Sequence, residues 1–122
     1  MISVYGLKTC DTCRAALKWL ESEELNYRFF DIRDYGVNAS TVRSWMGEVG
    51  CEALLNRRGT TWRGLSDTDK KNIDESKAIS LMVEHPTLIK RPVFQVNETV
   101  FVGFKSEQKT VLIAGQQESK RL

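Results

Sequence analysis

The sequence has one histidine, no long apolar run and almost no net charge among its 122 residues. His85 alone leaves little room for imidazole chemistry. The longest apolar runs, such as residues 78–83, are far shorter than the roughly 20 residues that a membrane span needs. Residues 1–5 show no feature of a signal peptide. A net charge of +2 is too balanced for a dedicated nucleic-acid binder. We therefore expect a cytoplasmic protein that contacts neither membranes nor nucleic acid directly.

Cysteine is scarce, and its number is odd. Cys10, Cys13 and Cys51 stand in a chain without an export signal, which does not fit a structural disulfide framework. Closely spaced cysteines in a reducing compartment more often serve catalysis, redox sensing or metal binding. Cys51 stands alone and fits plain packing. A zinc site made of these three and His85 would lack a second closely spaced pair of ligands, so we expect no metal.

Hydrophobic periodicity predicts an α/β fold. The expected elements are strands at 2–5, 26–32, 93–96 and 99–102, a helix from Asp11 to about residue 24, and a closing helix from Ser106 to about Ala114. The first two strands flank a helix, which is typical of a parallel βαβ unit. The last two flank a two-residue connection, which is typical of a hairpin. This order predicts a thioredoxin-like mixed sheet of four strands.

A stretch without a convincing strand separates the two halves of the sheet. Its expected elements are a helix to about Gly50 with Asn38 or Ser40 as cap, one or two helical turns at 51–56, a loop at 57–61, and a helix at 75–84 that Asp74 caps and Pro86 ends. The sequence therefore predicts one domain at 1–115, with a helical insertion at about 36–86 and a polar tail at 116–122.

The most informative motif is Cys10-Asp11-Thr12-Cys13-Arg14, at the junction of the first strand and the first helix. A helix N-terminus offers free N–H groups and partial positive charge, which stabilise a thiolate. Lys8 and Arg14 add cations on either side, and Asp11 opposes them. We therefore expect Cys10 to be the exposed, activated nucleophile.

Cys13 has two interpretations. As a resolving thiol, it would close a disulfide with Cys10 after oxidation. As a small buried hydrophobe, it would pack on the helical face that it shares with Leu17 and Leu20. The spacing alone allows both.

Arginines elsewhere in the chain suggest an anion-binding site. If the peptide bond before Pro92 is cis, it would form a rigid turn beside the Cys10 loop, and Arg91 would point its donors at a thiolate or an oxyanion there. Arg57, Arg58 and Arg63 form a second cationic set, which is either a solvated face or the wall of an anion-binding mouth.

Three blocks in this order resemble the arsenate reductase (ArsC) family, with its Spx and YffB branches. They are Tyr-Gly-Leu-Lys-Thr-Cys-Asp-Thr-Cys-Arg at 5–14, Leu-Leu-Asn-Arg-Arg-Gly-Thr-Thr-Trp-Arg at 54–63, and His-Pro-Thr-Leu-Ile-Lys-Arg-Pro at 85–92. The likeness covers about residues 1–115 and is greatest to the YffB-like branch. It implies a thioredoxin-like fold and a glutathione-dependent thiol reductase without a metal.

The resemblance also implies roles for individual residues. Cys10 would be the nucleophile, with Arg91 as its catalytic partner, and the charge pattern around the helix start adds Arg14 as a second catalytic cation. The expected anion- or glutathione-binding residues are Lys8, Thr12, Arg57, Arg58, Arg63 and Pro92. Two further arginines of the arsenate-reducing members have no match, because Asn56 and the segment 103–105 occupy their positions. The resemblance therefore implies an oxyanion or disulfide substrate without assigning arsenate.

The Spx branch offers a different class of function. A protein of that kind would be a redox-switched regulator that binds RNA polymerase, with a Cys10–Cys13 disulfide as its switch. The Cys-x-x-Cys fits this alternative, whereas the loop at 8–12 and the block at 56–63 fit it less well.

Overall fold

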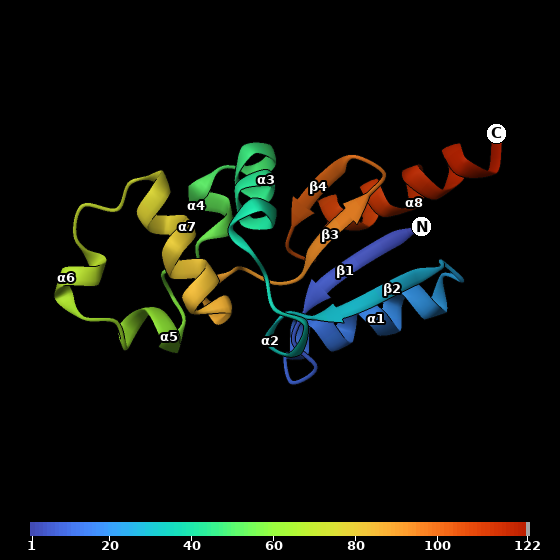
Figure 1. The fold of residues 1–122 in the computed structure, drawn as a ribbon. Coiled ribbons are helices and arrows are strands. Elements are labelled where there is room, and N and C mark those ends of the chain that lie inside the picture. The colour runs from blue at the N-terminus through green and yellow to red at the C-terminus, as the bar shows by residue number, and fades with distance from the viewer. Residues whose placement is uncertain (122) are drawn as a thin grey trace. The chain divides into compact units, whose positions relative to one another are not determined.

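The chain forms two compact units in this computed structural model, which describes the backbone of residues 1–121 and the side chains of residues 1–114. One unit combines Met1–Asp31 with Arg91–Leu122, and the other is Ile32–Lys90 (Figure 1). The helical insertion expected at about 36–86 lies inside the second unit. None of the helices within residues 1–121 has the length and apolar character that crossing a membrane requires.

The first unit contains a four-stranded mixed sheet in the order β2-β1-β3-β4. Its strands are β1 (Ile2–Gly6), β2 (Tyr27–Asp31), β3 (Val93–Val96) and β4 (Thr99–Val102). β1 runs parallel to β2 and antiparallel to β3, and β3 pairs antiparallel with β4. The parallel pair is joined through a helix, as a parallel connection requires. This topology confirms the predicted fold class.

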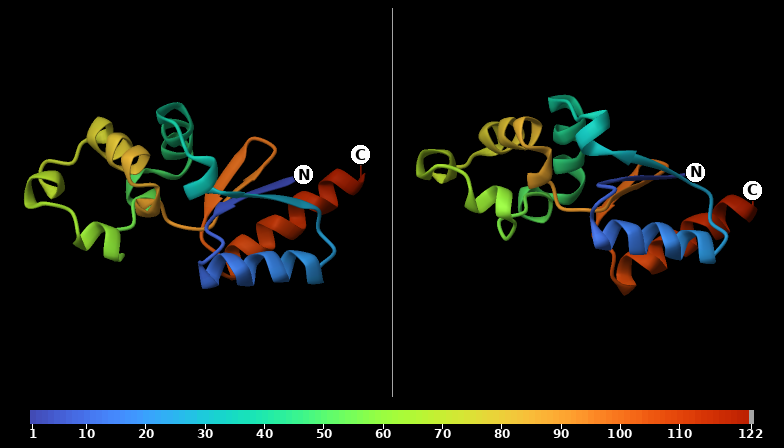
Figure 2. Two further views of the ribbon diagram at one scale, coloured as in Figure 1. Left: turned by 60° about the horizontal axis from the view of Figure 1, so that its bottom comes forward. Right: turned by 90° about the horizontal axis from the view of Figure 1, so that it is seen from below.

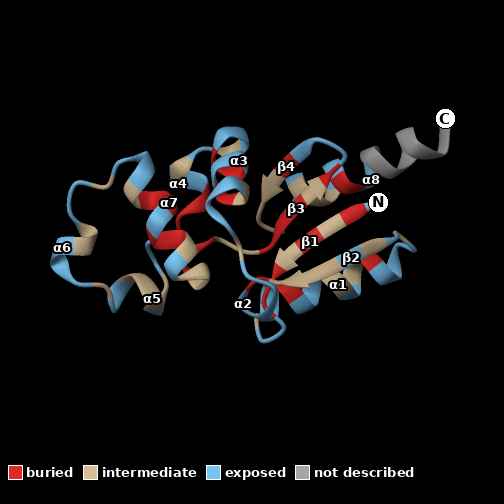
Figure 3. Ribbon diagram, in the orientation of Figure 1, coloured by how far each residue is buried: buried red, intermediate tan, exposed pale blue. Residues whose placement is uncertain are grey.

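Two helices cover the same face of this sheet, α1 (Asp11–Ser22) and α8 (Ser106–Arg121) (Figure 2). The core between the helices and the sheet is apolar, and its buried members are Ile2, Val4, Ala16, Leu20, Phe94, Val96 and Leu112 (Figure 3). Alternate residues of β1 point into it, because side chains on a strand alternate between faces. The core packs α1 and α8 against β1 and β3.

The second unit is helical. It contains α2 (Ile32–Tyr35), α3 (Ala39–Val49), α4 (Cys51–Leu54), α5 (Thr60–Arg63), α6 (Asp67–Lys70), α7 (Glu75–Glu84) and the 3-10 helix η1 (Pro86–Leu88). The side chains of Asn38 and Asp74 accept hydrogen bonds from backbone N–H groups three residues on, both at 2.8 Å. Both predicted caps are therefore confirmed, and α3 packs against α7.

A short antiparallel bridge ties two segments of the second unit together. Leu55 pairs with Ile89. On either side of the pair, the N–H of Asn56 donates to the carbonyl of Leu88 at 2.7 Å and that of Lys90 to the carbonyl of Leu54 at 2.8 Å. The block at 54–63 is thereby joined to the block at 85–92, although some thirty residues separate them.

Three boundaries differ from the sequence prediction. Ile32 begins α2 instead of ending the second strand, and its buried side chain belongs to the helical unit. The predicted loop at 57–61 is shorter, because α5 already begins at Thr60 after Gly59. The predicted end of the last helix near Ala114 is wrong, because α8 continues to Arg121. Gly115 is a weak stop signal, and the residues that follow it are mostly good helix formers without a proline, so the helix continues through it.

The docking of α8 on the sheet gives a stability prediction. Leu112 is completely buried, whereas its neighbour Val111 is 42% exposed. We expect Leu112→Ala to lower the free energy of unfolding by about 2–5 kcal/mol, and Val111→Ala to change it by less than about 0.5 kcal/mol. Urea unfolding followed by circular dichroism measures both values. Equal effects of the two substitutions would contradict the docking of α8 through Leu112.

Candidate active site

The loop between β1 and α1 is held by three hydrogen bonds in the first unit. The N–H of Lys8 donates to the Asp31 carboxylate at 2.9 Å, and the N–H of Cys10 donates to the Leu7 carbonyl at 3.1 Å. The Nε of Arg14 donates to the carbonyl of Lys8 at 2.8 Å. Cys10 itself has extended backbone angles (φ −85°, ψ 122°) as the residue before α1. The loop therefore presents the Cys10 side chain at the helix start.

The surroundings of Cys10 favour its thiolate. Partial burial acts to raise the pKa of the Cys10 thiol, but hydrogen bonding from the backbone N–H and the thiol of Cys13 and from the Arg91 guanidinium outweighs it. The positive charge of Arg91 acts in the same direction. The net result is a pKa below the ordinary value of 9.0. Since thiolate is the reactive form, Cys10 has the properties of a nucleophile.

Cys13 has the opposite environment. Its side chain is 1% exposed, and both cysteines are present as free thiols. Burial, reinforced by the neighbouring Cys10, raises the pKa of Cys13 to about 12. Cys13 therefore keeps its proton at neutral pH and can donate it in a hydrogen bond to Cys10. The structure shows the burial that one interpretation of Cys13 required, and a resolving role stays a prediction.

Arg91 and Pro92 precede β3, and their peptide bond is cis. Tyr5 of β1 pairs with Val93 of β3, so the two residues before Val93 lie at the end of the sheet where β1 enters the Cys10 loop. The carbonyl of Pro92 accepts the N–H of Gly103 at 2.9 Å, which fixes this turn against the segment after β4. The Nε of Arg91 is buried. Arg91 thus reaches Cys10 from a segment some eighty residues away in sequence.

The other residues expected beside Cys10 are more exposed. Arg14 binds the loop backbone and lies 3.9 Å from the Asp11 carboxylate, so its guanidinium holds the shape of the loop. Lys8 and Thr12 are exposed, the first in the loop and the second in the first turn of α1. These three residues surround the loop, whereas Arg91 acts on the sulfur directly.

In the second unit, part of the expected cationic set lines one cavity of about 390 Å³. Its walls include Arg57, Arg58 and Lys90, with Leu55 and Glu52. The Nζ of Lys90 donates to the Glu52 carbonyl at 3.1 Å. The three cations outnumber the single carboxylate, so the cavity favours an anion.

Side-chain contacts hold Arg57 in this cavity, and a backbone hydrogen bond holds the turn at Arg58. Arg57 pairs with the Glu52 carboxylate at 3.0 Å and lies over the Trp62 ring, 5.3 Å from its centroid. The side chain of Asn56 accepts the N–H of Arg58 at 3.0 Å and so shapes the turn. Arg63, which the sequence grouped with Arg57 and Arg58, does not line this cavity.

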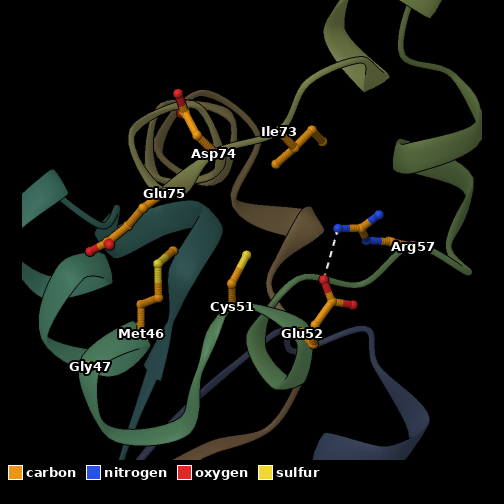
Figure 4. A pocket seen from close by; sticks show the side chains of 8 residues that line it. All are labelled: Met46, Gly47, Cys51, Glu52, Arg57, Ile73, Asp74 and Glu75. Carbon is orange, nitrogen blue, oxygen red and sulfur yellow. Dashed lines mark hydrogen bonds and ion pairs between the residues drawn. The ribbon is translucent and has the colours of Figure 1, made fainter.

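Cys51 lines a neighbouring pocket of about 350 Å³ in the second unit, which shares Glu52 and Arg57 with the cationic cavity. Figure 4 shows the Cys51 side chain with Met46 and Glu75 to one side, and Asp74, which also lines the pocket, at the start of the helix above. Burial, and then the Glu52 carboxylate, raise the pKa of the Cys51 thiol, which makes it a weak nucleophile at neutral pH. Among the residues that the structure describes, no three His, Cys, Asp or Glu side chains are grouped as metal ligands.

Two residues of these sites were missed by the sequence reasoning. Asp31 anchors the Cys10 loop, and it is the first acidic residue after the aromatic part of the second strand. Lys90 lines the cationic cavity, and its position beside Arg91 was the available signal. Neither contact is visible in a linear pattern, because each joins segments distant in sequence.

A thioredoxin-like sheet whose first helix starts at an activated cysteine defines a thiol oxidoreductase fold. The ArsC family model matches residues 5–111, and the chain belongs to the ArsC family. An uncharacterized protein of Haemophilus influenzae is 37% identical over 108 residues, which are 88% of this chain and 95% of that protein. The match to the ArsC family model confirms the resemblance that the three sequence blocks indicated.

Two more comparisons represent the branches expected from the sequence. The solved structure of the YffB protein superposes with a TM-score of 0.87 at 38% identity, covering 92% of this chain and 98% of that one. The global transcriptional regulator Spx 2 of Bacillus cereus is 26% identical over 88% of this chain and 83% of its own length. The chain is similar to both.

The pKa of Cys10 gives a prediction for its alkylation. We expect iodoacetamide at pH 7 to modify Cys10 ahead of Cys13 and Cys51, with a rate that rises with pH as the Cys10 thiolate forms. Arg91→Gln removes a cation that lowers the pKa of Cys10, so the rate at pH 7 should fall severalfold. Peptide mass spectrometry measures the rate at each cysteine. Arg28→Gln, on an exposed part of β2, is the matched control, and an equal loss there would contradict the role of Arg91.

Proposed function

We propose that this protein is a glutathione-dependent thiol oxidoreductase in which Cys10 is the nucleophile. The observation that carries the proposal is the set of groups around the Cys10 sulfur: the Cys13 N–H and thiol and the Arg91 guanidinium all favour its thiolate. The Cys13 N–H belongs to the first turn of α1, where the helix dipole also favours negative charge. A reducing cytoplasm, rich in glutathione, is the compartment that this chemistry suits.

The proposed reaction begins with a disulfide substrate. The Cys10 thiolate attacks one sulfur, a Cys10–substrate disulfide forms, and the other sulfur leaves as a thiolate that takes a proton from water. A first glutathione thiolate releases the substrate by taking its place on Cys10. A second glutathione then attacks the Cys10–glutathione disulfide, which regenerates the Cys10 thiolate and yields oxidised glutathione. Two glutathiones thus supply the two electrons that reduce one disulfide.

The state of Cys13 supports glutathione over an internal thiol as the resolving group. Burial raises the pKa of Cys13 to about 12, so its thiol keeps its proton at neutral pH and is a weak nucleophile. Its sulfur is also buried, so it is poorly placed to meet a bulky mixed disulfide. Glutathione, in contrast, reaches the half-exposed Cys10 sulfur from solvent. In this proposal Cys13 stabilises the nucleophile and does not resolve the intermediate.

The cationic cavity of the second unit supports binding of an anionic substrate. Glutathione carries two carboxylates, which pair well with guanidinium groups. Arg57, Arg58 and Lys90 line the cavity, and Lys90 directly precedes Arg91 in sequence. We assign to these residues the anion binding that the sequence predicted for Arg57 and Arg58. Lys8, Thr12 and Pro92 are proposed to bind near Cys10.

A redox-switched regulator is a second candidate, because the chain is similar to Spx 2 of Bacillus cereus and carries Cys10 and Cys13 in a Cys-x-x-Cys. In that case a Cys10–Cys13 disulfide would control binding to RNA polymerase. The two candidates differ in the partner of oxidised Cys10, which is glutathione in one and Cys13 in the other.

Oxidation of the protein decides between the candidates. After mild peroxide in the presence of glutathione, we expect mass spectrometry to find a glutathione adduct on Cys10. Cys10→Ser should lose the adduct and glutathione-dependent reduction of hydroxyethyl disulfide, whereas Cys51→Ser should keep both. A Cys10–Cys13 disulfide that excludes glutathione would contradict the proposal. Binding to the polymerase α subunit, compared under oxidising and reducing conditions, would then test the regulator.

Substitution of Arg58 tests whether the cationic cavity binds glutathione. We expect Arg58→Ala to raise the KM for glutathione about threefold to tenfold with little change in kcat, because it removes one charged contact in ground-state binding. Arg63→Ala is the matched control, since Arg63 does not line the cavity. An unchanged KM in Arg58→Ala would refute the assignment. Equal effects of both substitutions would instead support the wider cationic set predicted from the sequence.

A further inference from the structure

Gly6 is the last residue of β1 and is buried directly before the Cys10 loop. A Cβ built on Gly6 would overlap the sulfur of Cys13, and would lie 3.3 Å from the Cβ of Cys13 and 3.5 Å from a ring carbon of Phe29. Carbon and sulfur normally keep a separation of roughly 3.5–4 Å or more. The Cys13 sulfur therefore occupies the space that any side chain at position 6 would fill.

The glycine at this position is explained by space and not by backbone conformation. Gly6 lies in a regular strand and pairs with Asp31 of β2. Gly103, in contrast, has a φ of 98°, a value that favours glycine at any site. An alanine at position 6 would fit the backbone of β1 but would collide with Cys13.

The sulfur of Cys13 lies between two parts of the active site. On one side it contacts Gly6, and on the other its thiol is hydrogen-bonded to Cys10. The N–H of Leu7 also interacts with the Cys13 sulfur. Cys13 is held by the first turn of α1, so a side chain at position 6 would have to push its sulfur aside. Such a displacement would disturb the donor to Cys10.

We propose that Gly6 is a positioning residue for the nucleophile: the absence of a side chain there lets the Cys13 sulfur lie against β1, where its thiol donates to Cys10. The inference rests on the proposed role of Cys10 as nucleophile. Gly6 acts only through Cys13 and touches neither the substrate nor the reacting sulfur.

The test uses four variants of the full chain: Gly6→Ala, Cys13→Ala, the double variant, and Gly47→Ala as control. Gly47 lies in α3, and a Cβ there meets nothing within 4 Å. The readout is the rate of Cys10 alkylation by iodoacetamide as a function of pH, followed by peptide mass spectrometry. It requires no glutathione, so its outcome is separate from that of the turnover assay for the proposed function.

We expect Gly6→Ala and Cys13→Ala each to slow alkylation of Cys10 at pH 7 by up to about tenfold, the change expected for loss of one hydrogen bond to a charged sulfur. The double variant should have the same pH profile as Cys13→Ala, because the methyl of Ala then enters the space left by the sulfur. Gly47→Ala should match the parent protein.

Several results would overturn the proposal. One is a folded Gly6→Ala protein with an unchanged pH profile. Another is a further slowing when Gly6→Ala is added to Cys13→Ala, since Gly6 would then act by another route. If Gly6→Ala does not fold, the double variant decides: recovery of folding supports the contact with the sulfur, and failure to fold refutes it. An unchanged profile in Cys13→Ala would also refute the proposal.

Discussion

The pairing of β1 with its two neighbours is the constraint on which the rest of the candidate active site depends. Parallel pairing with β2 places Asp31 opposite Gly6, where its carboxylate holds the N–H of Lys8. Antiparallel pairing with β3 places Val93 opposite Tyr5, so Arg91 and Pro92 lie at the same end of the sheet as the loop. A slip of one residue in either register would turn these groups to the opposite face. The sheet therefore brings Cys10 and Arg91 together.

Within this frame, the two cysteines differ because their exposure differs. Cys10 precedes the helix, is partly exposed and receives hydrogen bonds that favour its thiolate. Cys13 lies one turn later on the buried face of α1, where burial keeps it protonated. The same spacing would suit a dithiol pair if both sulfurs were accessible. In this chain, the burial of one cysteine makes it a donor to the other.

In the helical unit, a short antiparallel bridge brings cations together. The bridge between Leu55 and Ile89 joins the ends of two distant segments, and Lys90 thereby lies in one cavity with Arg57 and Arg58. The side chain of Asn56 holds the turn before α5 by accepting the N–H of Arg58. The charge of the cavity thus comes from Arg57 and Arg58, the neighbours of Asn56, and from Lys90.

The sequence by itself determined the order of the four strands and of the longer helices, the cap at Asp74, and the place of Cys10 at a helix start, because each depends on residues within a few positions of one another. It left the cap of α3 open between Asn38 and Ser40, and the structure decided for Asn38. Local patterns misplaced the end of α8, because the helix continues through Gly115. Only the tertiary structure decided that Arg91 acts on the Cys10 sulfur while Arg14 holds the loop. It also decided that Cys13 fills the space beside Gly6. Such contacts depend on strand register and on packing between distant segments, which no spacing along the chain encodes.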